Sequence, residues 1–337
     1  MGILVTGGAG YIGSVLVERL VEEGFEVVVL DSLKRGHRDA VMTEATLVEA
    51  DVGDATALDE IFRRYRIEAV MHMAADISVE HSMSDPAGFM HNNVVCSMAL
   101  LDCVLRHGID RVVFSSSSAV YGEPSEVPVA EDAPPRPVNA YGESKLMLER
   151  VLFWYGQAYG LKSVSLRYFN ADGASRRFGK DHEPDTQLIP NVLKVALGRK
   201  EQLPVYGTDY DTPDGSCIRD YIHVLDIAEA HVLALRHLDD GATSSVYNLG
   251  NGTGYSVLEV VEQARQVTGC DIPLAVRPRR RGDPAALVAS ARRAREELGW
   301  RPRHPGLDDI IGSAWSWLLA HPAGYSDGAH GGVGGAR

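Results

Sequence analysis

Short apolar runs and helix-like segments alternate through the first half of the chain. The apolar runs are Ile3–Thr6, Val27–Leu30, Thr46–Ala50, Ala69–Met73, Arg111–Phe114 and Ser163–Leu166. Between them, apolar residues recur with the spacing of amphipathic helices, over 15–21, Thr56–Tyr65, Gly88–His107 and Tyr141–Gly160. Regular alternation of strand and helix predicts an α/β fold built on a doubly wound parallel sheet.

The pattern changes after about residue 170. Loops lengthen and become rich in Pro, Gly and Asp, and helical spacing recurs over Leu188–Gly198, Val224–Leu238, Ser256–Thr268, Ala291–Leu298 and Leu307–His321. We therefore expect a sheet domain over residues 1–170 and a smaller C-terminal α/β lobe over residues 171–325, covering the carboxyl edge of the sheet. Residues 326–337 are mostly Gly, Ala and polar residues, so we expect a disordered tail there.

Composition narrows the class of protein. Apolar residues make up 45% and charged residues 23% of the 337 residues, as in ordinary soluble domains. We find no apolar run of about 18 residues, and Met1 leads almost directly into the first strand, so we expect neither a membrane span nor a signal peptide. Four scattered cysteines suit reduced cytoplasmic thiols and no metal site. A net charge of −13 argues against nucleic-acid binding.

A glycine-rich turn joins the first strand to the first helix. Gly7 permits the tight turn, Gly10 lets the backbone approach a pyrophosphate, and Gly13 lets the helix pack closely. Asp31 ends the next apolar run, where a carboxylate binds ribose hydroxyls and repels a 2′-phosphate. The sheet is therefore predicted to be of the Rossmann type, with NAD as its cofactor. Lys34 and Arg35 are a counter-signal that would suit NADP.

Tyr141 and Lys145 stand four residues apart on a predicted helix, so they share a face. A phenol has a pKa of about 10 and is a poor base at neutral pH. We expect the Lys145 ammonium to lower the pKa of Tyr141, which makes Tyr141 a general base for an alcohol that passes a hydride to a nicotinamide.

Several stretches together resemble the extended short-chain dehydrogenases/reductases and, more narrowly, the UDP-glucose (UDP-galactose) 4-epimerase family. They are Thr6–Gly13, Phe114–Gly122, Tyr141–Lys145, Arg167–Asn170, Gly215–Val224 and Arg280–Pro284. The segment Arg219–Val224 and the loop before it are the most specific. The resemblance implies inversion at C4 of a UDP-sugar through a 4-keto intermediate, with NAD bound tightly throughout.

The resemblance also implies roles for individual residues. It assigns catalysis to Ser117, Tyr141 and Lys145. It places around NAD the residues Gly7, Gly10, Tyr11, Ile12, Gly13, Asp31, Asp51, Val52, Met73, Ala74, Ala75, Asn92, Ser115, Tyr141, Lys145 and Tyr168. It places around the UDP-sugar the residues Ser117, Tyr141, Asn170, Gln187, Leu188, Tyr206, Arg219, Arg280, Asp283 and Leu287. In the arginine-rich loop we expect Arg280 to meet the diphosphate and Arg279 to be solvated.

Departures from the family pattern bear on the substrate. Ser118 and Ala119 stand where related dehydratases carry an Asp-Glu pair, which argues against a dehydratase. Gln187, Ile77 and Leu287 occupy positions that vary among relatives, and Leu287 leaves tolerance of an N-acetyl group open. The alternatives are an epimerase of UDP-GlcNAc, UDP-glucuronate or a UDP-pentose, or another sugar-nucleotide oxidoreductase. A cofactor sensor without catalysis is disfavoured, because Ser117, Tyr141 and Lys145 are all present.

We expect a homodimer, because the family pairs the helices corresponding to Gly88–His107 and Tyr141–Gly160 with their copies. Candidate contacts are the apolar residues on these two helices, some of which must face the chain's own sheet: Val94, Val95, Met98, Leu101, Leu148, Leu152 and Tyr155.

Overall fold

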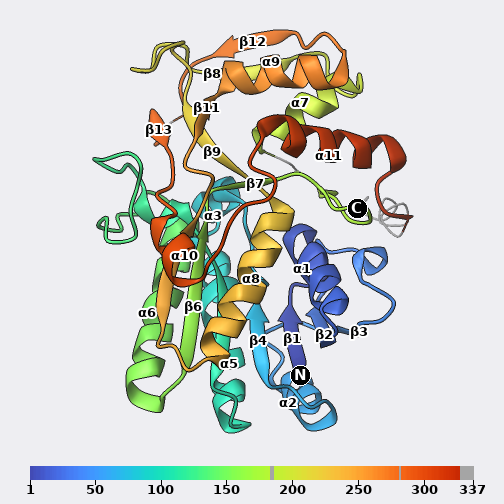
Figure 1. Cartoon of the computed structure of the whole chain (residues 1–337), viewed down its shortest axis with the longest axis vertical. Helices are drawn as coiled ribbons and strands as arrows, with labels where there is room; N and C mark the ends of the chain where they lie inside the picture. The colour runs from blue at the N-terminus through green and yellow to red at the C-terminus, as the bar shows by residue number, and fades with distance from the viewer. Residues whose placement is uncertain (183–185, 281, 327–337) are drawn as a thin grey trace, which may run out of the picture.

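The computed structural model describes residues 1–182, 186–280 and 282–326. Its main feature is a seven-stranded sheet with the order β10-β6-β5-β4-β1-β2-β3, in which all neighbours are parallel (Figure 1). The strands are β1 Gly2–Thr6, β2 Glu26–Asp31, β3 Thr46–Glu49, β4 Ala69–His72, β5 Arg111–Ser117, β6 Lys162–Tyr168 and β10 Ser245–Leu249. The predicted doubly wound α/β sheet is confirmed.

The chain winds outward from the middle of this sheet in both directions. It runs from β1 through β2 to β3, returns to β4, and continues through β5 and β6 to β10. The winding therefore reverses between β1 and β4. In open parallel sheets, ligands bind outside the carboxyl ends of the strands at such a switch point.

Helices cover both faces of the sheet and bury two apolar cores. One core joins the sheet to α1 (Tyr11–Glu22) and α8 (Val224–Asp239), which lie side by side (Figure 1). The other joins it to helices α2 Ala55–Arg64, α5 Cys96–Arg106 and α6 Ala140–Tyr159. The strands read as continuous apolar runs because both of their faces are buried.

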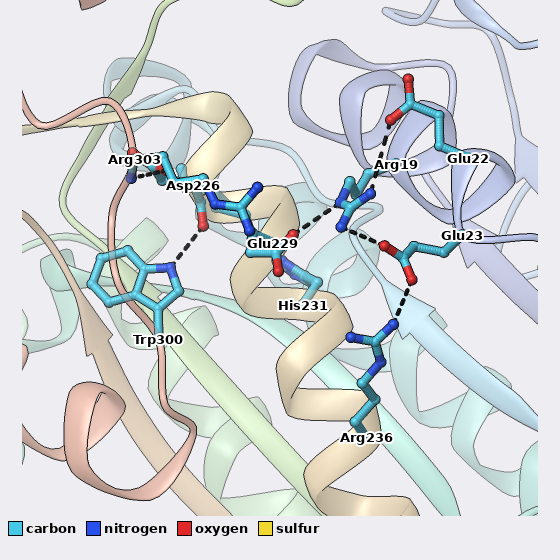
Figure 2. A network of polar contacts seen from close by, with 10 residues as sticks. Arg19, Glu22, Glu23, Asp226, Glu229, His231, Arg236, Trp300 and Arg303 are labelled. Carbon is cyan, nitrogen blue, oxygen red and sulfur yellow. Dashed lines mark hydrogen bonds and ion pairs between the residues drawn. The ribbon is translucent and has the colours of Figure 1, made fainter.

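Ion pairs and hydrogen bonds join α8 to its neighbours, as Figure 2 shows. Arg19 on α1 binds Glu229 on α8, with 2.9 Å between Nε and Oε2, and it also pairs with Glu23. Nearer the start of α8, the indole of Trp300 donates to the carbonyl of Asp226 over 2.9 Å. These contacts fasten one face of the sheet to a segment from the end of the chain.

A smaller lobe stands beyond the carboxyl ends of the large sheet (Figure 1). Its four-stranded sheet is built from β7 Asn170–Asp172, β9 Ile218–His223, β11 Gly254–Ser256 and β13 Ala286–Leu287, and a two-stranded sheet from β8 Leu203–Tyr206 and β12 Leu274–Arg277. Around a third apolar core pack helices α7 Leu188–Ala196, α9 Val257–Thr268 and α11 Leu307–Ala320. The helix α10, Arg292–Glu297, contacts β10 instead.

The lobes do not divide along the chain at residue 170. We expected α8 in the smaller lobe, yet it packs on the large sheet, and β10 is an edge strand of that sheet. The reason is that most of α8 is apolar and fully buried, and a parallel edge strand needs only a short apolar run. Of the expected tail, residues 327–337 lie outside the described residues.

The helix expected over Gly88–His107 is interrupted. It consists of α4 (Pro86–Met90), a π-helical turn (His91–Val95) and α5. Within the turn, Asn93 donates to the carbonyl of Asp76 over 2.9 Å and to the hydroxyl of Ser144 over 3.2 Å. π-Helical turns of this kind are frequently found at functional sites. A short helix α3, Val79–Ser84, precedes it and was not expected.

By length and composition alone, the helical stretch Pro86–Arg106 could cross a membrane, although the core helices of soluble proteins pass the same test.

Candidate active site

A cavity of about 470 Å³ runs along the carboxyl ends of the central strands, at the point where the winding reverses. All sixteen residues that we expected around the cofactor line it, from Gly7 at one end to Tyr168 at the other. Of the expected substrate residues, Ser117, Tyr141, Asn170 and Gln187 also line it. The position of this cavity is the one that strand order alone predicts for a ligand.

The glycines keep the turn compact and leave space beside it that side chains would fill. A Cβ on Gly13 would lie 2.1 Å from the carbonyl oxygen of Gly7, and Gly7 itself has a φ of +70°. At Gly10 a Cβ would meet only the Gly7 oxygen at 3.4 Å, so nothing in the chain itself requires glycine there. The N-cap Gly10 gives α1 no side-chain hydrogen bond, so the first amides of the helix remain available to an anion. These residues fit a dinucleotide pyrophosphate.

The acid at the end of β2 has a fixed orientation. The carboxylate of Asp31 accepts hydrogen bonds from the backbone amides of Ala9 and Leu33, at 3.0 and 2.9 Å. Burial is the larger influence and raises the pKa of Asp31. The two cations that would suit a 2′-phosphate are paired with acids. Lys34 pairs with Asp51 at 2.8 Å, and Arg35 pairs with Asp76 at 3.5 Å. The site therefore suits NAD better than NADP.

Tyr141 and Lys145 lie together in the cavity wall, as their spacing predicts. The Lys145 ammonium is 6.0 Å from the centre of the Tyr141 ring and donates to the carbonyl of Ser115 over 2.8 Å. Burial lowers the pKa of Lys145 to about 7, against the opposing charge of Glu149.

The expected lowering of the pKa of Tyr141 is wrong for the structure without ligands. Burial raises this pKa, and only a hydrogen bond with Ser117 opposes the rise. The reason is that the phenol is shielded from water, which disfavours its charged form.

Ser117 stands where β5 ends, because the strand runs three residues beyond the expected Phe114. Its hydroxyl accepts from the backbone amide of Ala119 over 3.1 Å and so begins the following 3-10 turn. It is also the hydrogen-bond partner of Tyr141. Ser117 is therefore both a turn residue and a neighbour of the phenol.

Tyr168 closes the cavity at the end of β6, and its hydroxyl lies 2.7 Å from Nε2 of His231. Nδ1 of His231 lies 2.9 Å from the carbonyl of Ile227, which can only accept, so Nδ1 carries the proton. The Tyr168 hydroxyl therefore donates to His231, which fixes the position of the ring.

The remaining substrate residues form a second group outside the cavity. Arg219 pairs with Asp283 at 3.0 Å and lies opposite Leu287 on the paired strand β13. The Arg280 guanidinium lies 3.9 Å from the centre of the Tyr206 ring. Leu188 begins α7, directly after Gln187. The second group is connected to the cavity through the small sheet, because β7, which begins at Asn170, pairs with β9.

We expected Arg279 to be solvated, but its side chain has partners within the protein. It pairs with Asp209 at 2.8 Å and lies over the Tyr210 ring at 4.2 Å. Arg280, by contrast, stacks on an aromatic ring and has no acid partner among the described residues.

Sequence reasoning missed the outer wall of the cavity. His37 and Tyr325 stack with 4.9 Å between ring centres, and the amide of Tyr325 donates to Asp181 over 2.8 Å. All three residues line the cavity. No spacing rule links residues so far apart in the chain.

Two groups of potential metal ligands occur among the described residues, and neither lines the cavity: Asp59, Cys103 and His107, and His223, His304 and Asp309. Two arginines lie against the first, at Asp59. The absence of a metal stays a prediction.

Comparison with known proteins identifies the family. Residues 3–250 match the NAD dependent epimerase/dehydratase family. The chain is 50% identical to a UDP-glucose 4-epimerase from Halalkalibacterium halodurans over 97% of this chain and 98% of that one. It is 48% identical to a solved UDP-glucose 4-epimerase structure, with a TM-score of 0.95 over 97% of this chain and 100% of that one.

A third similar protein was solved with ligands. It is the UDP-glucose 4-epimerase from Bifidobacterium longum in complex with NAD+ and UDP, 37% identical, with a TM-score of 0.91 over 96% of this chain and 100% of that one. From this full-length similarity, together with a cavity suited to NAD and the Ser117, Tyr141 and Lys145 side chains beside it, the chain belongs to the NAD dependent epimerase/dehydratase family and, within it, to the UDP-glucose 4-epimerases.

Proposed function

We propose that this protein interconverts UDP-glucose and UDP-galactose by inverting the configuration at C4, with NAD retained through the cycle. One observation supports this most strongly. Ser117, Tyr141 and Lys145 line the same cavity as the glycine turn and Asp31, so a proton acceptor and a dinucleotide site share one space. Bound there, NAD would take a hydride from C4 and return it to the other face of the sugar.

The side chains of the protein account for the proton. Tyr141 takes the proton from the C4 hydroxyl and later returns it, so no proton is lost over the cycle. Ser117, its hydrogen-bond partner, orients the same hydroxyl. Burial raises the pKa of Tyr141 and lowers that of Lys145, so it favours the uncharged form of both groups. Tyr141 must therefore lose its own proton before it can accept one from the substrate.

Substrate binding must hold UDP firmly while the hexose turns over. Arg219 and Arg280 supply two cations for the diphosphate, and an arginine fork suits phosphate oxygens. In a chain with a net charge of −13, such local cations also reduce repulsion of an anionic substrate. Asn170 and Gln187 line the cavity, and we expect them to contact the UDP-sugar.

We also propose a homodimer in the cytoplasm, formed through α5 and α6. Of the residues we expected in the contact, Leu101, Leu148 and Leu152 are buried in the core of the chain itself. The exposed apolar side chains on or next to these helices are Val95, Met98, Met147, Phe153, Trp154 and Tyr159. Exposed apolar groups concentrated on two helices are typical of a protein interface.

The test is to incubate the purified protein with UDP-glucose, UDP-GlcNAc, UDP-glucuronate and UDP-xylose and to identify products by NMR. We expect UDP-galactose from UDP-glucose without added cofactor, and NAD in the supernatant after the protein is denatured. Fast conversion of another sugar with none of UDP-glucose would move the function to a related epimerase. A protein free of NAD that requires stoichiometric NADPH would contradict the closed redox cycle.

A further inference from the structure

One turn after Lys145 on α6, Glu149 is buried and lies behind the wall of the cavity. Its carboxylate accepts two hydrogen bonds from Arg167, at 2.9 Å from Nε and 2.6 Å from Nη2. It accepts a third from the hydroxyl of Ser116. Glu149 and Arg167 are each less than 9% exposed, so this is an ion pair inside the protein.

Arg167 extends the network on its other side. Its Nη1 donates to the Tyr121 hydroxyl over 2.8 Å, and that hydroxyl donates to Asn248 over 2.7 Å. The guanidinium also lies 4.9 Å from the centre of the Tyr121 ring. The polar groups of this buried network therefore satisfy one another, as interior polar groups must.

Three segments that bear site residues, α6, β5 and β6, meet at this pair. Ser116 stands on β5 between Ser115, whose carbonyl accepts from Lys145, and Ser117. Arg167 immediately precedes Tyr168 on β6. Glu149 shares α6 with Lys145 and Tyr141 and lies about one helical turn after Lys145 and two after Tyr141. The pair thus connects α6, β5 and β6 directly behind the catalytic side chains.

Stability alone does not explain an ion pair in this position. Apolar residues of similar size often replace a buried pair without loss of stability. The surroundings of Lys145 give a more specific reason. Burial lowers the pKa of Lys145, and Glu149 is the one group that opposes this.

We propose that Glu149 is a positioning residue for the epimerase reaction, which holds Lys145 in its charged form and α6 in register with Ser117. This inference rests on the proposed function for its kinetic part only. Arg167 and Ser116 act on the reaction through Glu149, because their hydrogen bonds fix its carboxylate.

The ionisable groups around Lys145 come from three elements. Tyr141 and Glu149 share its helix, and His72 lies on β4. On β6, Arg167 pairs with Glu149 and Tyr168 interacts with Tyr141. His72 is neutral near pH 7 because burial lowers its pKa to about 3. Glu149 is therefore the negative charge that decides the protonation of Lys145.

The experiment compares the full-length protein with Glu149→Gln, which keeps the shape and removes the charge. The first measurement is the titration of the lysine ε-carbons by ¹³C NMR. The chain has six lysines, and Lys145→Met assigns the signal of interest. We expect Glu149→Gln to lower the pH at which Lys145 titrates by about one unit, the lower end of the effect of a neighbouring opposite charge. This measurement needs no epimerase activity.

The second measurement is the pH profile of kcat and KM with UDP-glucose. We expect kcat to fall about 10- to 100-fold, the usual consequence of small misplacement, and its alkaline limb to move to lower pH. KM should change less than kcat. Glu149→Asp keeps the charge and should restore the position of the limb.

Two variants separate positioning from folding. Glu149→Gln/Arg167→Gln avoids an unpaired interior guanidinium and should shift Lys145 in the same direction. Glu229→Gln breaks the Arg19 pair at the α1–α8 contact (Figure 2). Neither residue lines the cavity, so this variant should lower the melting temperature only. The inference would be overturned if Lys145 titrated as in the wild type both in Glu149→Gln and in Glu149→Gln/Arg167→Gln. A kcat profile of unchanged shape would also overturn it.

Discussion

At the scale of single residues, burial governs the chemistry of the site. Tyr141 is shielded from water and packs edge-on against Phe89, with ring centres 6.3 Å apart. The spacing of Tyr141 and Lys145 predicted their proximity, since a helix places such residues on one face. It could not predict the pKa of the phenol, because that depends on how many distant segments cover it.

Tyr141→Phe should lose turnover while keeping the fold. The ring remains to fill its space, and only the acid–base group is removed, which typically contributes about 100- to 10,000-fold in rate. We expect kcat to fall within that range and UDP affinity, measured by calorimetry, to stay the same. Near-normal epimerisation would show that another residue takes the proton.

Arg280→Ala should weaken substrate binding more than it slows the reaction. A hydrogen bond to a charged group contributes about 1.5–3 kcal/mol, so KM should rise by one to two orders of magnitude. Arg279→Ala is the matched control, because its charge is already paired with Asp209. A larger rise in KM for Arg279→Ala would place the diphosphate elsewhere.

At the scale of elements, apolar periodicity predicted most of the helices but only six of the thirteen strands that the described residues form. Five of these strands, β1, β2, β4, β5 and β6, were expected because they are almost wholly buried and read as apolar runs. The edge strand β3 is only partly buried, yet its short apolar run was enough to predict it. β13, with two residues, is too short to leave such a pattern. The π-helical turn was also missed, since it depends on Asn93 reaching Asp76 and Ser144 across the fold.

The dimer proposal concerns α5 and α6. Trp154 on α6 is 66% exposed in the single chain, so a charge there costs little until a partner covers it. We expect Trp154→Glu to convert the dimer to a 36.6 kDa species by light scattering at micromolar concentration. Leu319→Glu on α11, 55% exposed, is the control and should leave the mass unchanged. A monomeric wild type would contradict the dimer.

At the scale of the whole molecule, the chain crosses between its lobes more often than its loop lengths and residue composition suggested. The sequence indicated two lobes and the edge at which a ligand binds. It could not assign α8 and β10 to the large sheet, because an amphipathic helix does not show which surface it will cover. For the same reason the second group of substrate residues could not be placed relative to the cavity.

Three buried histidines make stability depend on pH. Burial lowers the pKa of His72 to about 3 and those of His223 and His231 to about 4, from an ordinary 6.5. Between pH 6.5 and 4 the unfolded chain therefore binds more protons, and stability falls as pH falls, by about 1.4 kcal/mol per unit for each histidine. We expect a lower melting temperature at pH 5.5 than at pH 7.5.

His231→Gln isolates one of these contributions. Asp220, whose pKa burial raises to about 6, acts in the opposite direction, so the comparison between variant and wild type is more informative than either alone. The variant should lose about a third of the pH-dependent destabilisation that we attribute to the histidines. An identical pH dependence in both proteins would rule out His231 as a contributor.

The central claim is that one enzyme-bound NAD takes the C4 hydride and returns it to the same carbon. The most direct measurement uses UDP-glucose deuterated at C4, purified protein and no added cofactor. The account predicts a mixture of UDP-glucose and UDP-galactose by NMR, with deuterium kept at C4 in both sugars. Conversion with the label lost to solvent, or no conversion without added NADH, would contradict it.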